Sequence, residues 1–156
     1  MLDDDAIARY ARQIVIPAVG AAGQEKLLAS TVLVVGNPRG CAQAALYLRA
    51  AGIRVTNSTS DGAFDLAIAA DAASLDSRLR RELIESKRPV CWYALGENGF
   101  ESGAYPDAEL PQQETAPAKS DRAASGHDAA ACDVASLACA ILLRLPHRAS
   151  AEIFEV

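Results

Sequence analysis

The residues best placed to do chemistry lie in a glycine-containing turn that opens at Gly36 and reads GNPRGC. The turn joins an apolar run to an alanine-rich segment, and strand–turn–helix units of this kind bind phosphate through backbone N–H groups. The usual G-x-G-x-x-G spacing is broken, because Pro38 and Cys41 stand at the second and third glycine positions. Proline has no N–H to donate, and a cysteine side chain opposes close helix–strand packing. Arg39 and Gly40 leave weak anion binding open.

Two further groups of residues have the types that nucleophilic chemistry needs. Cys91 lies in an apolar stretch with no histidine or lysine near it in sequence, whereas a reactive thiolate needs exposure and a lowered pKa. It is a weak candidate, and a buried thiol is the simpler interpretation. Residues 125–128 (SGHD) place nucleophile and base types side by side, but triads assemble in space, so adjacency alone indicates none. We expect His127 and His147 at the surface.

The four cysteines do not form a metal or disulfide pattern. Tetrahedral zinc sites need clustered thiolate or imidazole ligands, and this sequence has no C-x-x-C pair. We therefore predict reduced, mostly buried thiols and no metal site. Cys132 and Cys139 are seven residues apart, so we expect them on one helix face, in the core or in a dimer seam.

The elements that position the turn indicate an α/β fold. Residues 32–36 (VLVVG) form an apolar, β-branched run typical of a strand that is buried on both faces of a parallel sheet. The segment after the turn predicts a helix that Gly52 closes, which completes the first half of a βαβ unit. Further strands are predicted at 53–57, 64–70, 90–95, 100–105 and, as an edge strand, 151–156. We predict a Rossmann-like, mostly parallel sheet flanked by helices.

The remaining helices are predicted from caps and apolar periodicity. They lie at 6–13 behind an acidic N-cap, at 24–29 behind a turn at 19–23, at 74–86 and at 129–145. Residues 1–30 then form an N-terminal helical arm of a single domain that spans 1–156. Residues 106–128 contain prolines and almost no large apolar side chain, so we expect a long flexible loop.

Composition limits the partners that the protein can have. The 156 residues carry a net charge of −5 and no cluster of Lys and Arg, which argues against nucleic acid or an anionic membrane surface as a partner. We expect no membrane span, because no run approaches the length of one. The N-terminus is charged from its third residue, which does not fit a secretory signal, and we expect a cytoplasmic protein.

Several stretches together resemble the ThiF/MoeB/HesA-type adenylating enzymes, relatives of the ubiquitin-activating enzymes. The specific part is at 9–14 (RYARQI), 20, 23–28 (GQEKLL), 32–36 (VLVVG), 44–48 (AALYL) and 50–52 (AAG). The similarity is weaker at 64–68 (FDLAI), at 88–90 (RPV) and at 134–138 (VASLA), the last of which is similar to the family's C-terminal dimerisation helix. The resemblance implies a dimer that uses ATP and Mg²⁺ to adenylate a ubiquitin-like sulfur carrier.

The sequence also departs from that family at the residues that would bind the nucleotide. Its glycine loop is altered, and the strand that should end in a ribose-binding acid ends in residues 57–58 (NS). The long segment that carries phosphate-binding asparagine, arginine and lysine is absent between Thr56 and Phe64. The magnesium-binding aspartate corresponds to Asp71 only after a one-residue shift. Because polyphosphate needs its charge neutralised, we expect a degenerate member with no bound cofactor.

One implied site residue survives. In the family's dimers, the second arginine of R-Y-x-R-Q reaches the nucleotide of the other subunit, and Arg12 matches that position. The leading hypothesis is a pseudoenzyme that pairs with itself, with an active ThiF-type enzyme or with a ubiquitin-like carrier, and that offers Arg12 in trans. The simpler alternative is that Arg12 is a solvated residue retained by descent.

Two other functions stay open. One is a minimal ATP-dependent adenylyltransferase whose phosphate site is rebuilt from Arg39 and Asp71, with ATP and Mg²⁺ as cofactors. The other is a domain that binds a small ligand in the former nucleotide crevice.

Overall fold

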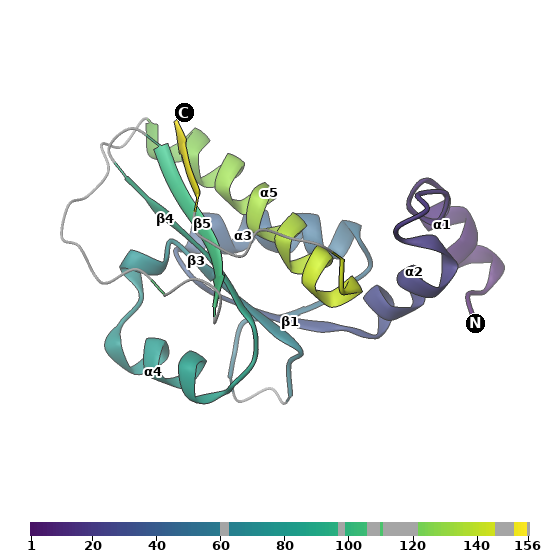
Figure 1. The fold of residues 1–156 in the computed structure, drawn as a ribbon, viewed down its shortest axis with the longest axis horizontal. Helices are drawn as coiled ribbons and strands as arrows, with labels where there is room; N and C mark the ends of the chain where they lie inside the picture. Colours follow the sequence, from purple (N-terminus) through teal and green to yellow (C-terminus); the bar gives the residue numbers. More distant parts are fainter. Residues whose placement is uncertain (60–62, 97–98, 106–109, 111–121, 146–151, 156) are drawn as a thin grey trace.

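A computed structural model of the chain describes residues 1–59, 63–96, 99–105, 110 and 122–145, together with the backbone of 152–155. Its centre is a six-stranded sheet with the order β2-β1-β3-β4-β5-β6 (Figure 1). The strands are β1 (Thr31–Gly36), β2 (Arg54–Thr56), β3 (Leu66–Ala70), β4 (Val90–Leu95), β5 (Gly99–Tyr105) and β6 (Glu152–Glu155). The first four are mutually parallel, whereas β5 and β6 are added in antiparallel pairs. The predicted Rossmann-like α/β architecture is confirmed.

Helices cover both faces of the sheet (Figure 1). The long helix α5 (Arg122–Leu143) and α3 (Pro38–Ala50) pack together on one face, and α4 (Ser77–Glu85) covers the other after the short 3₁₀ helix η1 (Ala72–Ser74). The helices α1 (Asp4–Ile14) and α2 (Gly20–Ala29) form an arm at the end of the molecule opposite α4. Asp3 caps α1 by accepting a hydrogen bond from the backbone N–H of Ala6 at 2.8 Å.

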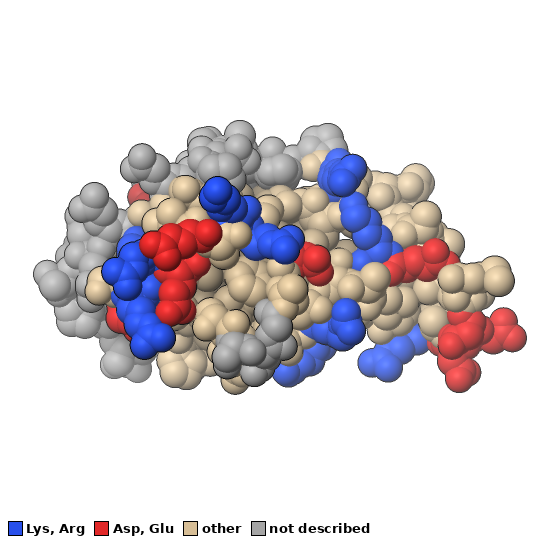
Figure 2. Space-filling model, turned by 90° about the horizontal axis from the view of Figure 1, so that it is seen from below, with Lys and Arg blue, Asp and Glu red and all other residues tan. Residues whose placement is uncertain are grey.

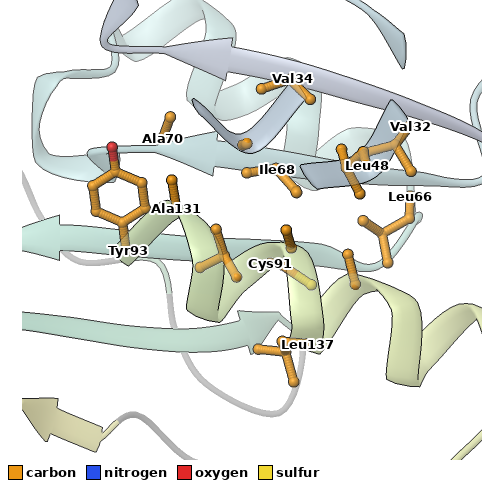
Figure 3. Close-up of a cluster of buried hydrophobic side chains, with 14 of the residues drawn as sticks. Val32, Val34, Leu48, Leu66, Ile68, Ala70, Cys91, Tyr93, Ala131 and Leu137 are labelled. Atoms are coloured by element: carbon orange, nitrogen blue, oxygen red, sulfur yellow. The ribbon is translucent and has the colours of Figure 1, made fainter. Parts of the chain in front are cut away.

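Strand alternation divides the core into two layers. Val32 and Val34 of β1 face α3 and α5, and the neighbouring Leu33 and Val35 face α4. Figure 3 shows the first layer, in which apolar side chains of β1, β3 and β4 meet the helix that carries Ala131. Because the strands are apolar on both sides, the sequence pattern of an unbroken run was a correct signal for a doubly covered sheet.

Four helices, α1, α2, α3 and α5, begin earlier than the sequence predicted. α2 begins at Gly20, so the predicted turn at 19–23 is wrong from Gly20 onward. Gly23 lets α2 lie close to α5, since a Cβ there would come within 3.1 Å of Leu143 Cδ2. α3 begins at Pro38, so residues 38–40 form its first helical turn rather than a free loop, which suits proline at that position.

The largest correction concerns the loop predicted at 106–128. Residues 122–128 belong to α5, which begins at Arg122 instead of 129. Tertiary packing explains the difference: Gly126 lies close enough to Leu95 that a Cβ would meet its Cδ2 at 3.3 Å, and His127 is buried against β4. Of the rest of the predicted loop, 106–109 and 111–121 lie outside the described residues.

The core position of α5 also accounts for its apolar composition. The window Gly126–Leu143 is long and apolar enough to cross a membrane by length and composition alone, which the sequence prediction of no such run had missed. Half of the window is buried inside the protein, as in the core helix of a globular fold.

The surface on the other side of the sheet from α5 has mixed charge: basic and acidic side chains lie next to one another there (Figure 2). On α4 these include the pair Arg78–Glu82, at 2.9 Å.

Candidate functional site

The topology directs attention to the carboxyl ends of β1 and β3. The chain leaves β1 through α3 and returns to the sheet at β2 on one side, and β3 then lies on the other side of β1. In open α/β sheets, the crevice at such a switch point is where ligands bind. The turn from Gly36 into α3 forms one wall of this region, and the residues that follow β3 form the other.

Gly36 brings the end of β1 very close to β3. Its φ of +113° lies in the region that L residues avoid, and a Cβ at this position would overlap the carbonyl oxygen of Ala70. The N–H of Asn37 donates to the same carbonyl at 2.8 Å. Gly36 is thus required by strand geometry, and its retention does not depend on a bound phosphate.

The backbone N–H groups that begin α3 already have acceptors within the chain. Asn37 Oδ1 accepts from the N–H of Arg39 at 3.0 Å and from that of Gly40 at 3.4 Å. The N–H of Cys41 donates to the carbonyl of Asn37 at 2.9 Å, and Pro38 has no N–H. Asparagine is a favoured N-cap because it satisfies these groups. The donors that a phosphate would use are therefore taken by Asn37.

Gly40 is explained by an aromatic side chain. A Cβ at Gly40 would overlap the Tyr93 hydroxyl and come within 3.1 Å of Ala70 Cβ. Tyr93 is fully buried, and its hydroxyl is hydrogen-bonded to His127 Nδ1 at 2.8 Å. The two rings meet edge to face with centroids 5.8 Å apart. Tyr93 and His127 therefore fill the space between the start of α3 and the start of α5.

Acidic groups surround His127. Asp71 follows β3 in a left-handed conformation with φ of 56°, and its Oδ1 accepts from the N–H of Leu95 at 3.5 Å. Burial raises the pKa of Asp71, and a hydrogen bond from the backbone opposes the shift. Burial lowers the pKa of His127, and the nearby Asp71 and Asp128 carboxylates oppose that shift.

Arg39 faces away from the crevice wall formed by α4. Its Nη2 lies 3.4 Å from Asp128 Oδ2 in the second turn of α5, and both side chains are about half exposed, at 52% and 44%. Its positive charge is thus already balanced by a carboxylate. Arg39 and Asp71, the two residues of the predicted rebuilt phosphate site, each lie close enough to His127 to act on its pKa.

On the α4 side of the same turn the molecule is hollowed. A cavity of about 360 Å³ is lined by Gly36, Asn37 and Pro38 from the turn and by Leu75, Asp76 and Leu79 from the start of α4. Asp76 caps α4, since its Oδ1 accepts from the N–H of Leu79 at 2.8 Å. The hollow lies in the range of small-ligand pockets by volume.

The other candidate residues are scattered. Cys91 is fully buried in the core, and burial raises its pKa, which does not fit a nucleophilic thiolate. Cys132 is exposed, so it does not lie in the core, and its place in a dimer seam stays a prediction. Cys139 is partly buried with a pKa raised to about 11. Arg12 is exposed on the last turn of α1, far along the arm from Asp71. Within the described part of the chain, no three His, Cys, Asp or Glu side chains are grouped to hold a metal.

Sequence reasoning missed the residues that fill the site. His127 was predicted at the surface and is 6% exposed, and Tyr93 was given no role. The available signals were the tyrosine late in an apolar strand and the SGHD run, but neither reveals that the two residues meet. His147 lies outside the described residues.

Comparisons with known proteins give one consistent result. The adenylyltransferase and sulfurtransferase MOCS3 of Anopheles gambiae is 55% identical over 53 residues, and those of Aedes aegypti and Drosophila sechellia are 53% and 54% identical over 53 and 52 residues. Each match covers 33% of this chain but only 11–12% of the relative's length. No family model matches the chain. The similarity therefore supports a relationship to the ThiF/MoeB-type adenylating family over a third of this chain.

Proposed function

We propose that this protein is a non-catalytic, ThiF/MoeB-like partner in the activation of ubiquitin-like sulfur-carrier proteins. The relatives that share a third of the chain are named as adenylyltransferases and sulfurtransferases. The observation that carries the non-catalytic part of the proposal is the start of α3. Its N–H groups are used by Asn37 and its nearest arginine is paired with Asp128.

The hydrogen bonds at the start of α3 matter because of what catalysis of adenylation requires. Adenylation depends on donors and positive charge that are aimed at the polyphosphate before the reaction begins. Freeing the α3 amides would mean breaking the Asn37 cap, and freeing Arg39 would leave Asp128 without its ion pair. A phosphate would thus have to displace existing interactions instead of meeting preorganised ones.

The N-terminal arm supports action through protein contact. Val15 and Ile16, which are adjacent in sequence at the end of α1, are 76% and 47% exposed, so the arm presents apolar side chains to solvent. Arg12 lies nearby in sequence at the end of α1, and among the described residues it has no hydrogen-bond or ion-pair partner. We propose that this surface contacts a second subunit, either the same chain or an active adenylating enzyme, and presents Arg12 to it.

The non-catalytic role is tested by ATP-dependent pyrophosphate exchange with the purified protein and a ubiquitin-like carrier. We expect no exchange above a protein-free control, and pyrophosphate released by the protein alone would overturn the proposal. Native co-purification should recover an adenylating enzyme or carrier as a stoichiometric partner.

The Arg12 role has a matched control on the same helix. Arg9 stacks over the Tyr10 ring at 5.6 Å, so its guanidinium is engaged within the arm. We expect Arg12→Ala to reduce the activity of a co-expressed active partner and Arg9→Ala to leave it near wild type. Equal activity of the partner with Arg12→Ala and with the wild type would contradict the trans-arginine role.

A further inference from the structure

We propose that the hollow between the β1–α3 turn and α4 binds a small, phosphate-free heterocyclic molecule through its N–H donors. This inference concerns a ligand site and goes beyond the proposed role in protein contact. It rests on the position of the cavity, the chemistry of its walls and the charges that are missing from it.

The cavity has the position and size of a ligand site. It lies at the carboxyl ends of β1 and β3, where the order of the sheet reverses, and its volume is about 360 Å³. Pockets for small organic molecules begin at roughly 300 Å³. The floor is formed by the Gly36 turn, which is fixed by its close approach to Ala70.

The walls favour a flat, partly apolar molecule. Pro38 faces the cavity from the start of α3, and Leu75 and Leu79 face it from the residues that lead into α4. Leu75 belongs to the core layer on this face of the sheet, so this wall is anchored. Burial of a ring against such surfaces is favourable in proportion to the apolar area removed from water.

Two polar side chains line the cavity, those of Asn37 and Asp76. Asp76 contributes a carboxylate whose Oδ1 is used by the N–H of Leu79, while its Oδ2 has no partner among the described residues. The side-chain oxygen of Asn37 is already committed to the start of α3. A ligand with an amine or a ring N–H can therefore donate to Asp76.

The same groups disfavour phosphate. A phosphate placed here would meet the negative charge of Asp76 and no unsatisfied N–H from α3. Positive charge does not compensate, because Arg39 pairs with Asp128 on the other side of the turn and Arg78 pairs with Glu82. Like charges that approach closely in a partly desolvated site repel, so each added phosphate should weaken binding.

The series adenosine, AMP and ATP without Mg²⁺ tests the idea, because its members share one heterocycle and differ in charge. We expect saturable adenosine binding by isothermal titration or ligand-observed NMR, with ATP about tenfold weaker or more, a difference of about 1.4 kcal/mol. No binding of adenosine, or ATP binding as tightly as adenosine, would overturn the inference.

Asp76→Asn tests the carboxylate without removing the helix cap, since asparagine caps as well as aspartate. We expect this variant to bind adenosine more weakly and to lose most of the preference for adenosine over ATP. Glu85→Gln is the control at the other end of α4, where a charge is removed far from the cavity, and it should behave as wild type. An unchanged preference in Asp76→Asn contradicts the assignment.

Leu79→Gln provides a second test of the wall and should weaken adenosine and ATP alike, after circular dichroism has shown that each variant is folded. Binding of ATP as tightly as adenosine, without any pyrophosphate exchange, would refute this site yet leave the non-catalytic role intact. Exchange activity would refute that role by itself, so the two proposals fail separately.

Discussion

The two sides of the β1–α3 turn have opposite character. Toward α5, the space beside the turn is filled by the Tyr93 and His127 side chains, and the Arg39–Asp128 pair lies at the start of the two helices. Toward α4, the same turn borders a hollow with walls from Pro38 and from residues that lead into α4. One glycine-containing turn therefore supports a packed polar cluster on one side and an accessible cavity on the other.

This difference shows that a glycine can be retained for reasons unrelated to a ligand. Gly36 is needed where two strands converge, and Gly40 is needed because the Tyr93 hydroxyl occupies the place of a Cβ. A sequence motif that counts glycines cannot separate such packing roles from phosphate binding. The hydrogen bonds of the N–H groups make the distinction, and here Asn37 accepts them.

The largest effect should come from the residue that both sides share. Gly36→Ala adds a Cβ against the Ala70 carbonyl and imposes a strained φ, so we expect a loss of roughly 2–6 kcal/mol in the free energy of unfolding. Urea denaturation measures it. Gly20→Ala is the matched control, because Gly20 also has positive φ but no heavy atom lies within 4 Å of the added Cβ. We expect it to cost only about 1–2 kcal/mol, and equal costs would contradict the close approach.

The next largest effect concerns only the α5 side of the turn, which the Tyr93 and His127 side chains fill. Gly40→Ala should lower the free energy of unfolding by about 1–3 kcal/mol, because the new Cβ collides with the buried Tyr93 hydroxyl. Tyr93→Phe should cost about 1–3 kcal/mol by leaving His127 Nδ1 without its partner. In the double variant the collision is relieved, so the combined cost should fall well below the sum. Additive costs would show that Gly40 and Tyr93 do not contact.

A smaller effect should follow from uncapping α3. Asn37→Ala removes the acceptor for the N–H groups of Arg39 and Gly40, and we expect a loss of about 0.5–2 kcal/mol in the free energy of unfolding. Inorganic phosphate should then stabilise this variant more than the wild type, because the donors become available. Asn57→Ala, at an exposed position, is the control and should show neither change. Equal phosphate effects on Asn37→Ala and wild type would refute the capping argument.

The smallest effect concerns pH and the buried histidine. The folded-state pKa of His127 is lowered by burial from 6.5, so its contribution to stability is present above pH 6.5 and is lost as pH falls through the folded value. The free energy of unfolding should decline in that window by no more than about 1.4 kcal/mol per pH unit. His127→Gln should flatten the decline.

Asp71, which lies near His127, also contributes to the pH dependence of the free energy of unfolding. The pKa of Asp71 is raised from 3.8, so its contribution is present below pH 3.8 and is lost as pH rises through its folded value. The Asp71→Asn variant separates the two contributions, and the charges of Arg39 and Asp128 stay in place in both variants. A decline that survives in His127→Gln would mean that another group is responsible.

Sequence alone determined the sheet and much of its setting. Unbroken apolar runs such as 32–36 can be buried on both faces only in a covered, mostly parallel sheet, so their periodicity was sufficient to predict the architecture. The loss of the phosphate-binding pattern was equally readable, because Pro38 cannot donate whatever surrounds it. The start of α5 was not readable, since Gly126 and the polar residues beside it weaken the local helix preference, and packing against β4 outweighs that weakness.

Only the tertiary structure decided what occupies each side of the turn. Tyr93 and His127 are 34 residues apart, and Arg39 and Asp128 are 89 apart, so no local pattern specifies either contact. Those contacts arise because α3 and α5 pack on the same face of the sheet and bring the first turn of α3 and the second turn of α5 to the carboxyl ends of β3 and β4. Sequence periodicity encodes which face of an element is buried, whereas the partner that meets it depends on how the elements assemble.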